Sequence, residues 1–254
     1  MRRLMDSHVH LDGLGDAEAA ISKAREVGVD GVVAVGGNLE SSARALELAE
    51  LHPGYVFPAI GVHPADVLKV EVAEAVAYVD ENASRVVAVG EIGLDYAYGF
   101  AKPPEVRERM RALYGELLGV AEAHGLPVAV HSRSAYGDAL AGLRARDVRG
   151  AVFHWYDGPI SVLREILDAG YYVSATPAAR YSRGHMEVVR ETPLERLLVE
   201  TDSPVYMRDL GRMSEPADVR LTVEAVAGLK GVEPGEVIRV STRNAETLFR
   251  LPAP

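Results

Sequence analysis

One unit recurs along this sequence: a short apolar run followed by a segment with the residue pattern of a helix. Short apolar runs that end at turn residues are typical of strands buried on both faces. The strand candidates are residues 4–10, 31–36, 56–61, 86–90, 127–131, 151–154, 171–174 and 197–201. Strands that alternate with helices predict a parallel sheet covered by helices, which is an α/β fold.

Helix-like segments separate these strands. They are residues 16–27, 39–51, 72–82, 104–124, 134–145, 160–169 and 185–191, and segments 216–229 and 234–249 follow the last strand. Pro104 stands just inside a helix start, a position that does not need its missing N–H. Gly28, Gly125 and Gly170 each follow a helix, as C-terminal capping glycines do.

Eight parallel strands are enough to close a barrel. The length of 254 residues is also typical of one such unit. The alternative is an open doubly wound sheet, which would carry a glycine-rich phosphate turn after its first strand. The first strand here ends instead in His8-Val9-His10. We therefore expect residues 1–254 to form a single (β/α)8 TIM barrel that ends in C-terminal helices.

Composition narrows the class of protein. The chain has no cysteine, so it has neither a disulfide framework nor thiolate metal ligands. Its net charge of −10 argues against a protein that coats nucleic acid through a basic face. No apolar run approaches the roughly 18 residues of a membrane span, and the first residues lack the apolar region of a signal peptide. We expect a cytoplasmic protein with no membrane partner.

Residues of the types that bind metals follow several of the apolar runs: His8, His10, Glu91, His131, His154 and Asp202. The carboxyl ends of barrel strands meet at one face, where barrel enzymes place their chemistry. The two histidines of the first strand point to the same side and can hold one cation. Isolated His-x-His pairs are often surface residues, so the other four positions are what favours a metal site.

Strand adjacency predicts two cation sites. The first and eighth strands are neighbours in a closed barrel, so their histidines and Asp202 can share one cation. The histidines of the fifth and sixth strands can hold a second, and Glu91 has two oxygens with which to bridge the pair. Two cations about 3.5–4 Å apart clamp the attacking and leaving oxygens of a displacement. Asp202 can also accept a proton from the attacking water, so we expect Glu91 and Asp202 to be catalytic.

Some of these residues have plainer interpretations. Asp202 precedes Ser203-Pro204 and can cap a turn, and His154 can be a hydrogen-bonded core histidine. Glu91 lies among apolar neighbours, where a buried carboxylate needs a cation or an arginine. Three further histidines lie in or beside helices and are expected to face solvent: His52, His124 and His185.

Substrate contacts are expected around the same barrel mouth. His63 and Arg133 are the candidates for binding a phosphate, because Arg133 lies two residues beyond a metal-ligand candidate. The alternative for Arg133 is a salt bridge with a carboxylate at the top of the barrel. Trp155 and Tyr156 can stack on a base, or they can wall the pocket by packing.

Motifs are spread in order over nearly the whole chain. They are Asp6-Ser7-His8-Val9-His10-Leu11-Asp12, Gly61-Val62-His63-Pro64, Gly90-Glu91-Ile92-Gly93-Leu94-Asp95, His131-Ser132-Arg133, Phe153-His154, Glu200-Thr201-Asp202-Ser203-Pro204, Glu215-Pro216 and Asn244-Ala245. A chain with these motifs resembles the TatD-type deoxyribonucleases of the metal-dependent amidohydrolase superfamily. The resemblance implies a (β/α)8 barrel with two divalent cations that hydrolyses DNA phosphodiester bonds as an exonuclease, through a metal-activated water.

The implied ligand sets coincide with those reached from strand adjacency: one cation at His8, His10 and Asp202, the other at His131 and His154, and Glu91 shared by both. Ligands of these types admit Zn, Mg, Mn, Fe or Ni. The chain departs from the family pattern after His154, where Trp155-Tyr156 follow, and at Met213-Ser214, which replace an Arg-Asn pair. These positions face the substrate, so DNA is a less firm expectation than hydrolysis.

Two other functions compete. One is a different hydrolase of the same superfamily, acting on another ester, an amide or a lactone. Many such enzymes use a modified lysine as the metal bridge, but Lys23, Lys69, Lys102 and Lys230 all lie away from strand ends. The other is a scaffold without activity, which would be expected to have lost some of the six ligands. DNA or another phosphoester is therefore the expected partner.

Overall fold

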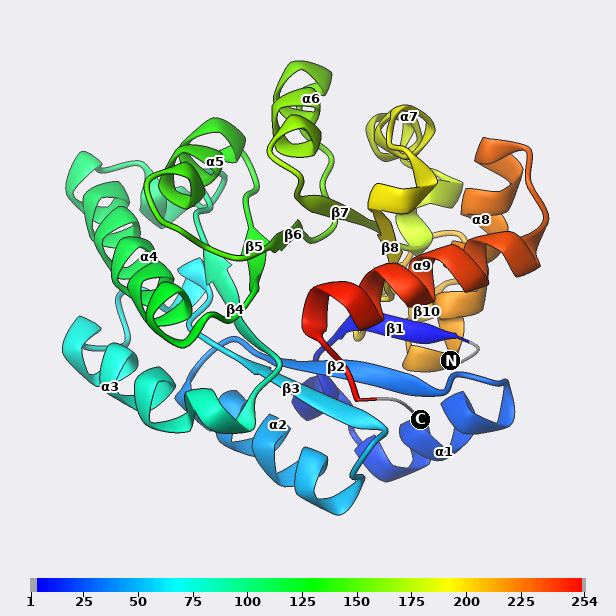
Figure 1. The fold of residues 1–254 in the computed structure, drawn as a ribbon, viewed down its shortest axis with the longest axis horizontal. Coiled ribbons are helices and arrows are strands. Elements are labelled where there is room, and N and C mark those ends of the chain that lie inside the picture. Colours follow the sequence, from blue (N-terminus) through cyan, green and yellow to red (C-terminus); the bar gives the residue numbers. More distant parts are fainter. Residues whose placement is uncertain (1–3, 253–254) are drawn as a thin grey trace.

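An eight-stranded parallel barrel surrounded by helices forms the centre of the molecule (Figure 1). The computed structural model describes residues 4–252. Its strands pair in the order of the sequence, from the first to the eighth. They are β1 (Met5–Val9), β2 (Gly31–Gly36), β3 (Val56–Ile60), β4 (Ala88–Gly93), β5 (Val128–His131), β6 (Ala151–Phe153), β7 (Tyr172–Ala175) and β8 (Leu197–Val199). The expected TIM barrel is confirmed.

Helices connect successive strands and cover the outside of the barrel (Figure 1). They are α1 (Ala17–Glu26), α2 (Leu39–Leu51), α3 (Val72–Asn82), α4 (Pro104–His124), α5 (Tyr136–Arg144), α6 (Ile160–Asp168), α7 (Arg183–Glu191), α8 (Val219–Lys230) and α9 (Pro234–Phe249). Gly125 adopts a φ of 61° directly after α4, so it ends that helix in the left-handed conformation that glycine tolerates.

Most boundaries agree within two residues, and the structure differs most from the expected boundaries in three places. β4 continues through Glu91 to Gly93, so Glu91 lies within the strand and not after it. The segment expected to begin α8 at Pro216 forms a separate 3-10 turn, Pro216–Asp218. A short hairpin, β9 (Tyr206–Met207) and β10 (Arg212–Met213), follows β8 and was not expected, because its residues alternate in no clear apolar pattern.

The seam between β1 and β8 is joined at the end of β1 and just beyond the end of β8. Val9 and Ser203 form a parallel bridge. The N–H of His10 donates to the carbonyl oxygen of Ser203 at 2.8 Å, and that of Asp202 to the carbonyl oxygen of His8 at 3.0 Å. The seam therefore sets metal-ligand candidates from the two ends of the chain side by side.

Helix α9 lies across one end of the barrel (Figure 1). Its Leu248 and Phe249 join a buried cluster with alternate strand residues such as Val33 and Val35 of β2. A second, larger cluster packs the strands against the surrounding helices. Within residues 4–252, no helix combines the length and the apolar character needed to cross a membrane.

Candidate metal centre

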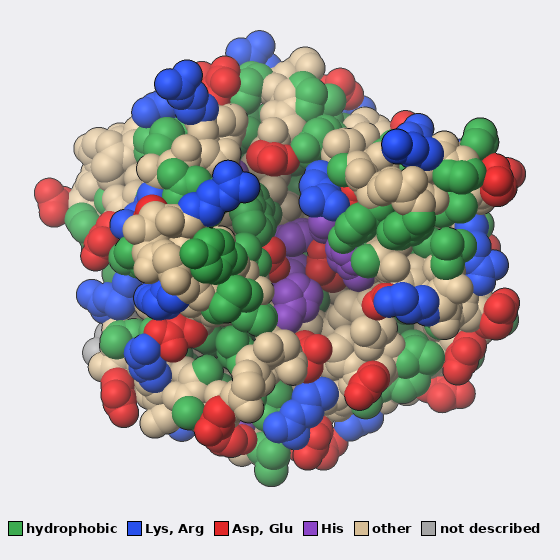
Figure 2. All heavy atoms as spheres, turned by 180° about the vertical axis from the view of Figure 1, so that it is seen from behind, with side chains coloured by type: hydrophobic (Ala, Val, Ile, Leu, Met, Phe, Trp, Pro, Cys, Tyr) green, Lys and Arg blue, Asp and Glu red, His purple; other side chains and the backbone are tan. Residues whose placement is uncertain are grey.

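A hollow opens in the face of the barrel turned away from α9, and histidine side chains lie at its bottom (Figure 2). Two adjoining cavities occupy it, one of about 610 Å³ and one of about 370 Å³. Both are lined by His131, His154 and Asp202, and the smaller one also reaches His10 and Glu91. All six residues expected to bind metal converge here.

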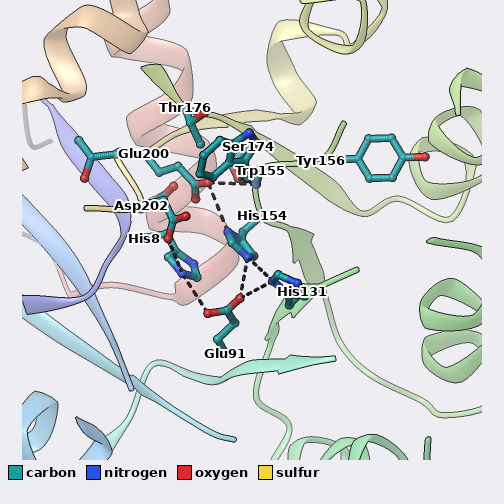
Figure 3. A network of polar contacts seen from close by, with 12 residues as sticks. His8, Glu91, His131, His154, Trp155, Tyr156, Ser174, Thr176, Glu200 and Asp202 are labelled. Carbon is teal, nitrogen blue, oxygen red and sulfur yellow. Dashed lines mark hydrogen bonds and ion pairs between the residues drawn. The ribbon is translucent and has the colours of Figure 1, made fainter. Parts of the chain in front are cut away.

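Glu91 lies at the centre of the cluster and is 2% exposed. Its Oε1 is 2.7 Å from Nε2 of His154 and 2.8 Å from Nδ1 of His131 (Figure 3). Its Oε2 instead faces His8 of β1 and His10 just after that strand, at 3.6 Å and 3.5 Å from their Nε2 atoms. The two carboxylate oxygens therefore serve two different histidine pairs.

Asp202 completes one side of this arrangement. Its Oδ1 lies 3.3 Å from Nε2 of His10 and 3.6 Å from Nε2 of His8. Its φ of 50° falls in the left-handed region, which aspartate tolerates better than most residues. The backbone hydrogen bond to His8 holds this conformation and turns the carboxylate toward the histidines, beyond any role in capping a turn.

Ring nitrogens within the cluster face one another. Nε2 of His8 and Nε2 of His10 are 3.3 Å apart, and Nδ1 of His131 and Nε2 of His154 are 3.2 Å apart. Only one proton fits between two such nitrogens, so at least one lone pair in each contact is free to bind a cation. Imidazole nitrogens and carboxylate oxygens are also the donors that Zn²⁺ and similar ions take in proteins. The donor set fits divalent metals.

Groups behind the cluster orient two of its histidines. Nδ1 of His10 donates to the carbonyl oxygen of Val35 at 3.1 Å, so Nε2 is the nitrogen that can bind a cation beside Asp202. Nε2 of His131 donates to Asp95 at 2.8 Å, so Nδ1 is the nitrogen that can bind a cation beside Glu91. Metal-binding histidines are commonly oriented in this way by a carbonyl or a carboxylate.

Two buried carboxylates lie behind the histidines, in what we call the outer layer of the site. Neither was expected there from the sequence. Asp95 is fully buried beside His131, and Glu200 is 1% exposed beside His154. Oε1 of Glu200 accepts from the N–H of Trp155 at 3.0 Å and lies 3.6 Å from Nδ1 of His154 (Figure 3). Glu200 stands just beyond β8 and two residues before Asp202, in the same sequence motif, and that motif is the sequence signal that points to it.

The electrostatics of the cluster favour bound protons when metal is absent. Burial alone would lower the pKa of His10, but the hydrogen bond and charge of Asp202, with Glu91, raise it to about 9. Burial alone would raise the pKa of Glu91, but the charge of His154 and the hydrogen bonds from His131 and His154 hold it well below its ordinary value. A cation would replace the protons that balance these carboxylates.

His63 belongs to the same cluster and lies within reach of an ion beside Glu91 and His131, but its ring proton faces them. Its Nδ1 accepts from the N–H of Ala65 at 3.0 Å, so the proton of the neutral ring lies on Nε2. That nitrogen is 3.2 Å from Nδ1 of His131 and 3.5 Å from Oε1 of Glu91. Burial lowers the pKa of His63 to about 4, which keeps the ring neutral. It therefore offers an N–H group at the edge of the cluster.

Arg133 lines the larger cavity and is about half exposed. Its Nε donates to Asp95 at 2.8 Å, and its guanidinium lies 4.7 Å from the ring centre of Tyr98. The salt bridge considered as an alternative is thus present, but it uses only Nε. Among residues 4–252 the two terminal nitrogens have no hydrogen-bond acceptor, so they stay free for an anion.

The structure separates the two aromatic candidates. Trp155 lines the larger cavity. Tyr156 is fully buried, points away from the cluster (Figure 3), and donates its hydroxyl to the carbonyl oxygen of Pro159 at 2.8 Å. Stacking of Tyr156 on a base is therefore ruled out, and the packing interpretation is the correct one for this residue.

The expectation that three helix-associated histidines face solvent is wrong for one of them. His52 and His124 contact surface carboxylates, with Nε2 at 2.9 Å from Glu18 and 2.7 Å from Asp80. His185 is fully buried, because α7 packs it against the residues that follow β6 and β7. Its Nε2 accepts from the N–H of Thr176 at 3.1 Å, and its Nδ1 donates to a backbone carbonyl oxygen at 2.9 Å.

Known proteins resemble this chain in sequence and in fold. Residues 5–250 match the family described as TatD related DNase. Human deoxyribonuclease TATDN3 is 33% identical, over 97% of this chain and 94% of that protein. A Bacillus subtilis protein described as the uncharacterized metal-dependent hydrolase YabD is 31% identical, over 98% and 99%. The crystal structure of YJJV, a TatD homologue from Escherichia coli, superposes with a TM-score of 0.88 at 28% identity and covers 98% of this chain and 99% of its own.

Proposed function

Because the chain belongs to the TatD related DNase family, we propose that residues 1–254 act as one metal-dependent hydrolase that cleaves DNA phosphodiester bonds from a strand end. The observation that carries this proposal is the arrangement at Glu91, whose two oxygens face separate histidine pairs at the bottom of an open cavity. Such an arrangement suits two cations that share one carboxylate.

The residues around Glu91 divide into two ligand sets. His8, His10 and Asp202 would hold one divalent ion, since their facing atoms all lie on the β1–β8 side of the cluster. His131 and His154 would hold the other, and Glu91 would contact both. When bound, a pair of Zn, Mg, Mn, Fe or Ni ions supplies Lewis acidity and makes a water molecule nucleophilic at neutral pH.

Asp202 is the group that accepts the proton of the attacking water. Burial acts to raise its pKa, but the hydrogen bond from His10 and the neighbouring histidines hold it below its ordinary value. The carboxylate is therefore ionised at neutral pH, and it lines both cavities where substrate would lie. A positioned carboxylate of this kind can take a proton in the transition state.

Two hydrogen-bond donors flank the cluster and suit a phosphate group. One is the Nε2–H of His63, and the other is the pair of terminal nitrogens of Arg133. Trp155 lines the adjoining cavity and offers a ring for a base. Because Glu91 is almost fully buried, a substrate must enter the barrel mouth, which an unpaired strand end can do more easily than a duplex.

One observation favours a second function. Among the described residues, Arg133 and Arg208 are the only basic side chains other than histidine that line the larger cavity, and the face around it carries charges of both signs (Figure 2). A long DNA strand would gain little from such a surface. A smaller ester, amide or lactone would be a suitable substrate for the same cluster.

A substrate comparison tests the two functions. Metal-reconstituted protein is incubated with an end-labelled single-stranded oligonucleotide and, separately, with a panel of carboxylic esters, amides and lactones. We expect stepwise shortening of the oligonucleotide that stops with a chelator and in Asp202→Asn. Turnover of a panel member with an intact oligonucleotide would replace the deoxyribonuclease proposal by the second function.

A further inference from the structure

One carboxylate oxygen in the outer layer of the site serves two neighbours at once. Oδ2 of Asp95 lies 2.8 Å from Nε2 of His131 and 2.8 Å from Nε of Arg133. Its other oxygen, Oδ1, accepts from the N–H of Ala97 at 2.8 Å. Asp95 is fully buried and lines neither cavity of the barrel mouth. It therefore acts through its two neighbours and not on a substrate.

The backbone fixes Asp95 between those neighbours. The N–H of Leu94 donates to the carbonyl oxygen of His131 at 3.0 Å, and the N–H of Tyr96 donates to that of Arg133 at 3.1 Å. These bonds continue the parallel pairing of β4 with β5 beyond the end of β4. The side chain of Asp95 is thus held in register with both residues by the sheet itself.

Each neighbour gains a defined geometry from this contact. A hydrogen bond to Asp95 keeps the proton of neutral His131 on Nε2, so the lone pair of Nδ1 is available to a cation held beside Glu91. The same oxygen takes Nε of Arg133, while the ring of Tyr98 supports one face of the guanidinium. A half-exposed arginine would otherwise sample many rotamers, and here its terminal nitrogens keep one direction.

We propose that Asp95 is a positioning residue that couples the metal cluster to the substrate-phosphate contact by orienting His131 and Arg133 through a single oxygen. The part that concerns phosphate rests on the proposed function, whereas the part that concerns metal does not. Because one atom contacts both residues, a substitution of Asp95 should weaken both metal affinity and phosphate binding, which otherwise depend on separate residues.

The Asp95→Asn substitution keeps the shape and removes the charge of the shared acceptor. If the amide NH2 takes the place of Oδ2, it opposes the Nε–H of Arg133 and forces Nε2 of His131 to accept, which moves the ring proton to Nδ1. If the amide oxygen takes that place, the NH2 opposes the N–H of Ala97. Asp138→Asn is the matched control, since Asp138 is exposed and bonds to Tyr96 away from the cavity.

Zinc binding is the first readout, measured by competition with a chelator. Loss of a carboxylate behind a metal-binding histidine typically lowers metal affinity by about 10–100-fold. We expect Asp95→Asn to show a loss of this size and Asp138→Asn to bind zinc as the wild type does. Unchanged zinc affinity in a folded Asp95→Asn protein would overturn the proposal.

Binding of inorganic phosphate to the zinc-loaded protein and oligonucleotide kinetics give the second readout. Asp95→Asn should weaken phosphate binding and raise KM about as much as Arg133→Ala does. In the Arg133→Ala background, Asp95→Asn should lower kcat and leave KM where it is, because the arginine it would orient is gone. KM effects that simply add would show that Asp95 does not act through Arg133.

Two controls keep these outcomes distinct. If wild-type protein does not cut the oligonucleotide, the proposed function fails. The zinc and phosphate binding measurements still test the positioning role of Asp95. If Asp95→Asn does not fold, nitrogen NMR of His131 in the zinc-loaded wild type decides. A proton on Nε2 supports the proposal, and a proton on Nδ1 contradicts it.

Discussion

The N–H of Asp202 donates to the carbonyl oxygen of His8 at 3.0 Å, and the side chains of the same two residues face each other with Oδ1 and Nε2 3.6 Å apart. Backbone pairing at this seam joins the eighth strand to the first. The proposed ligands of one cation therefore lie on both sides of the seam. A cation held between them would stabilise the closed barrel as well as act in chemistry.

This arrangement predicts a metal-dependent melting temperature. At about 100 times its dissociation constant, a ligand adds about 2.7 kcal/mol to the free energy of unfolding. For a domain of this size that corresponds to a rise in Tm of roughly 5–10 °C. We expect Zn²⁺ to produce such a rise in the wild type and a smaller one in Asp202→Asn. Equal rises in calorimetry of both proteins would place the stabilising cation away from the seam.

Glu91→Gln tests the shared carboxylate. An amide nitrogen cannot ligate a cation, so one of the two oxygens that face the histidine pairs is lost, while the shape of the side chain is kept. We expect weaker binding at both sites, an intact circular dichroism spectrum, and turnover reduced by at least about 10²-fold. Near-normal turnover by metal-loaded Glu91→Gln would remove Glu91 from the catalytic site.

Much of the fold followed from the sequence because strands buried on both faces have a continuous apolar pattern. The helices Leu39–Leu51 and Pro104–His124 have the expected ends, since their start and stop residues are local signals. The hairpin of β9 and β10 carries exposed residues such as Tyr206 and Met213, so no burial pattern marked it.

The convergence of the candidate ligands also followed, because residues at the carboxyl ends of parallel strands must meet. The positions of the carboxylates in the outer layer did not follow from the sequence. Asp95 and Glu200 are buried carboxylates whose partners lie on other strands, and a single sequence does not distinguish such residues from exposed ones. The direction of Tyr156 and His185 depends on how loops pack over the barrel, which local pattern does not encode.

Metal affinity should rise with pH. In the metal-free protein His10 has a pKa of about 9, so at neutral pH its ring carries a proton that a cation must displace. Each displaced proton raises apparent affinity by up to about tenfold per pH unit below that pKa. We expect zinc affinity to increase from about pH 6 to about pH 8, with protons released in calorimetry. A flat profile without proton release would mean that zinc does not bind His10.

His185→Ala tests the buried histidine behind the site. Removing it leaves a cavity and deprives the Thr176 N–H of its acceptor, so we expect about 2–4 kcal/mol of destabilisation in urea unfolding. His124→Ala, at an exposed contact with a carboxylate, should change stability by less than about 0.5 kcal/mol. Similar values for the two variants would contradict the buried placement of His185.

The lowered pKa of His185 also predicts how the stability of the protein changes in acid. Burial lowers the pKa of His185, so the unfolded chain binds this proton more readily than the folded one. Its contribution to stability is complete above the unfolded value of about 6.5 and is lost as pH falls toward the lower folded value. Wild-type protein should therefore lose more stability than His185→Ala between about pH 7 and about pH 5, and parallel losses would argue against a neutral buried ring.

Metal content measures the central claim most directly. Protein is stripped with a chelator, loaded separately with Zn, Mn, Fe, Ni and Mg ions, freed of unbound metal, and analysed by mass spectrometry for metal per chain. The arrangement of four histidines around Glu91 and Asp202 predicts up to two ions per chain for at least one metal, and fewer in Glu91→Gln. Less than half an ion per chain with every metal would contradict the two-metal account.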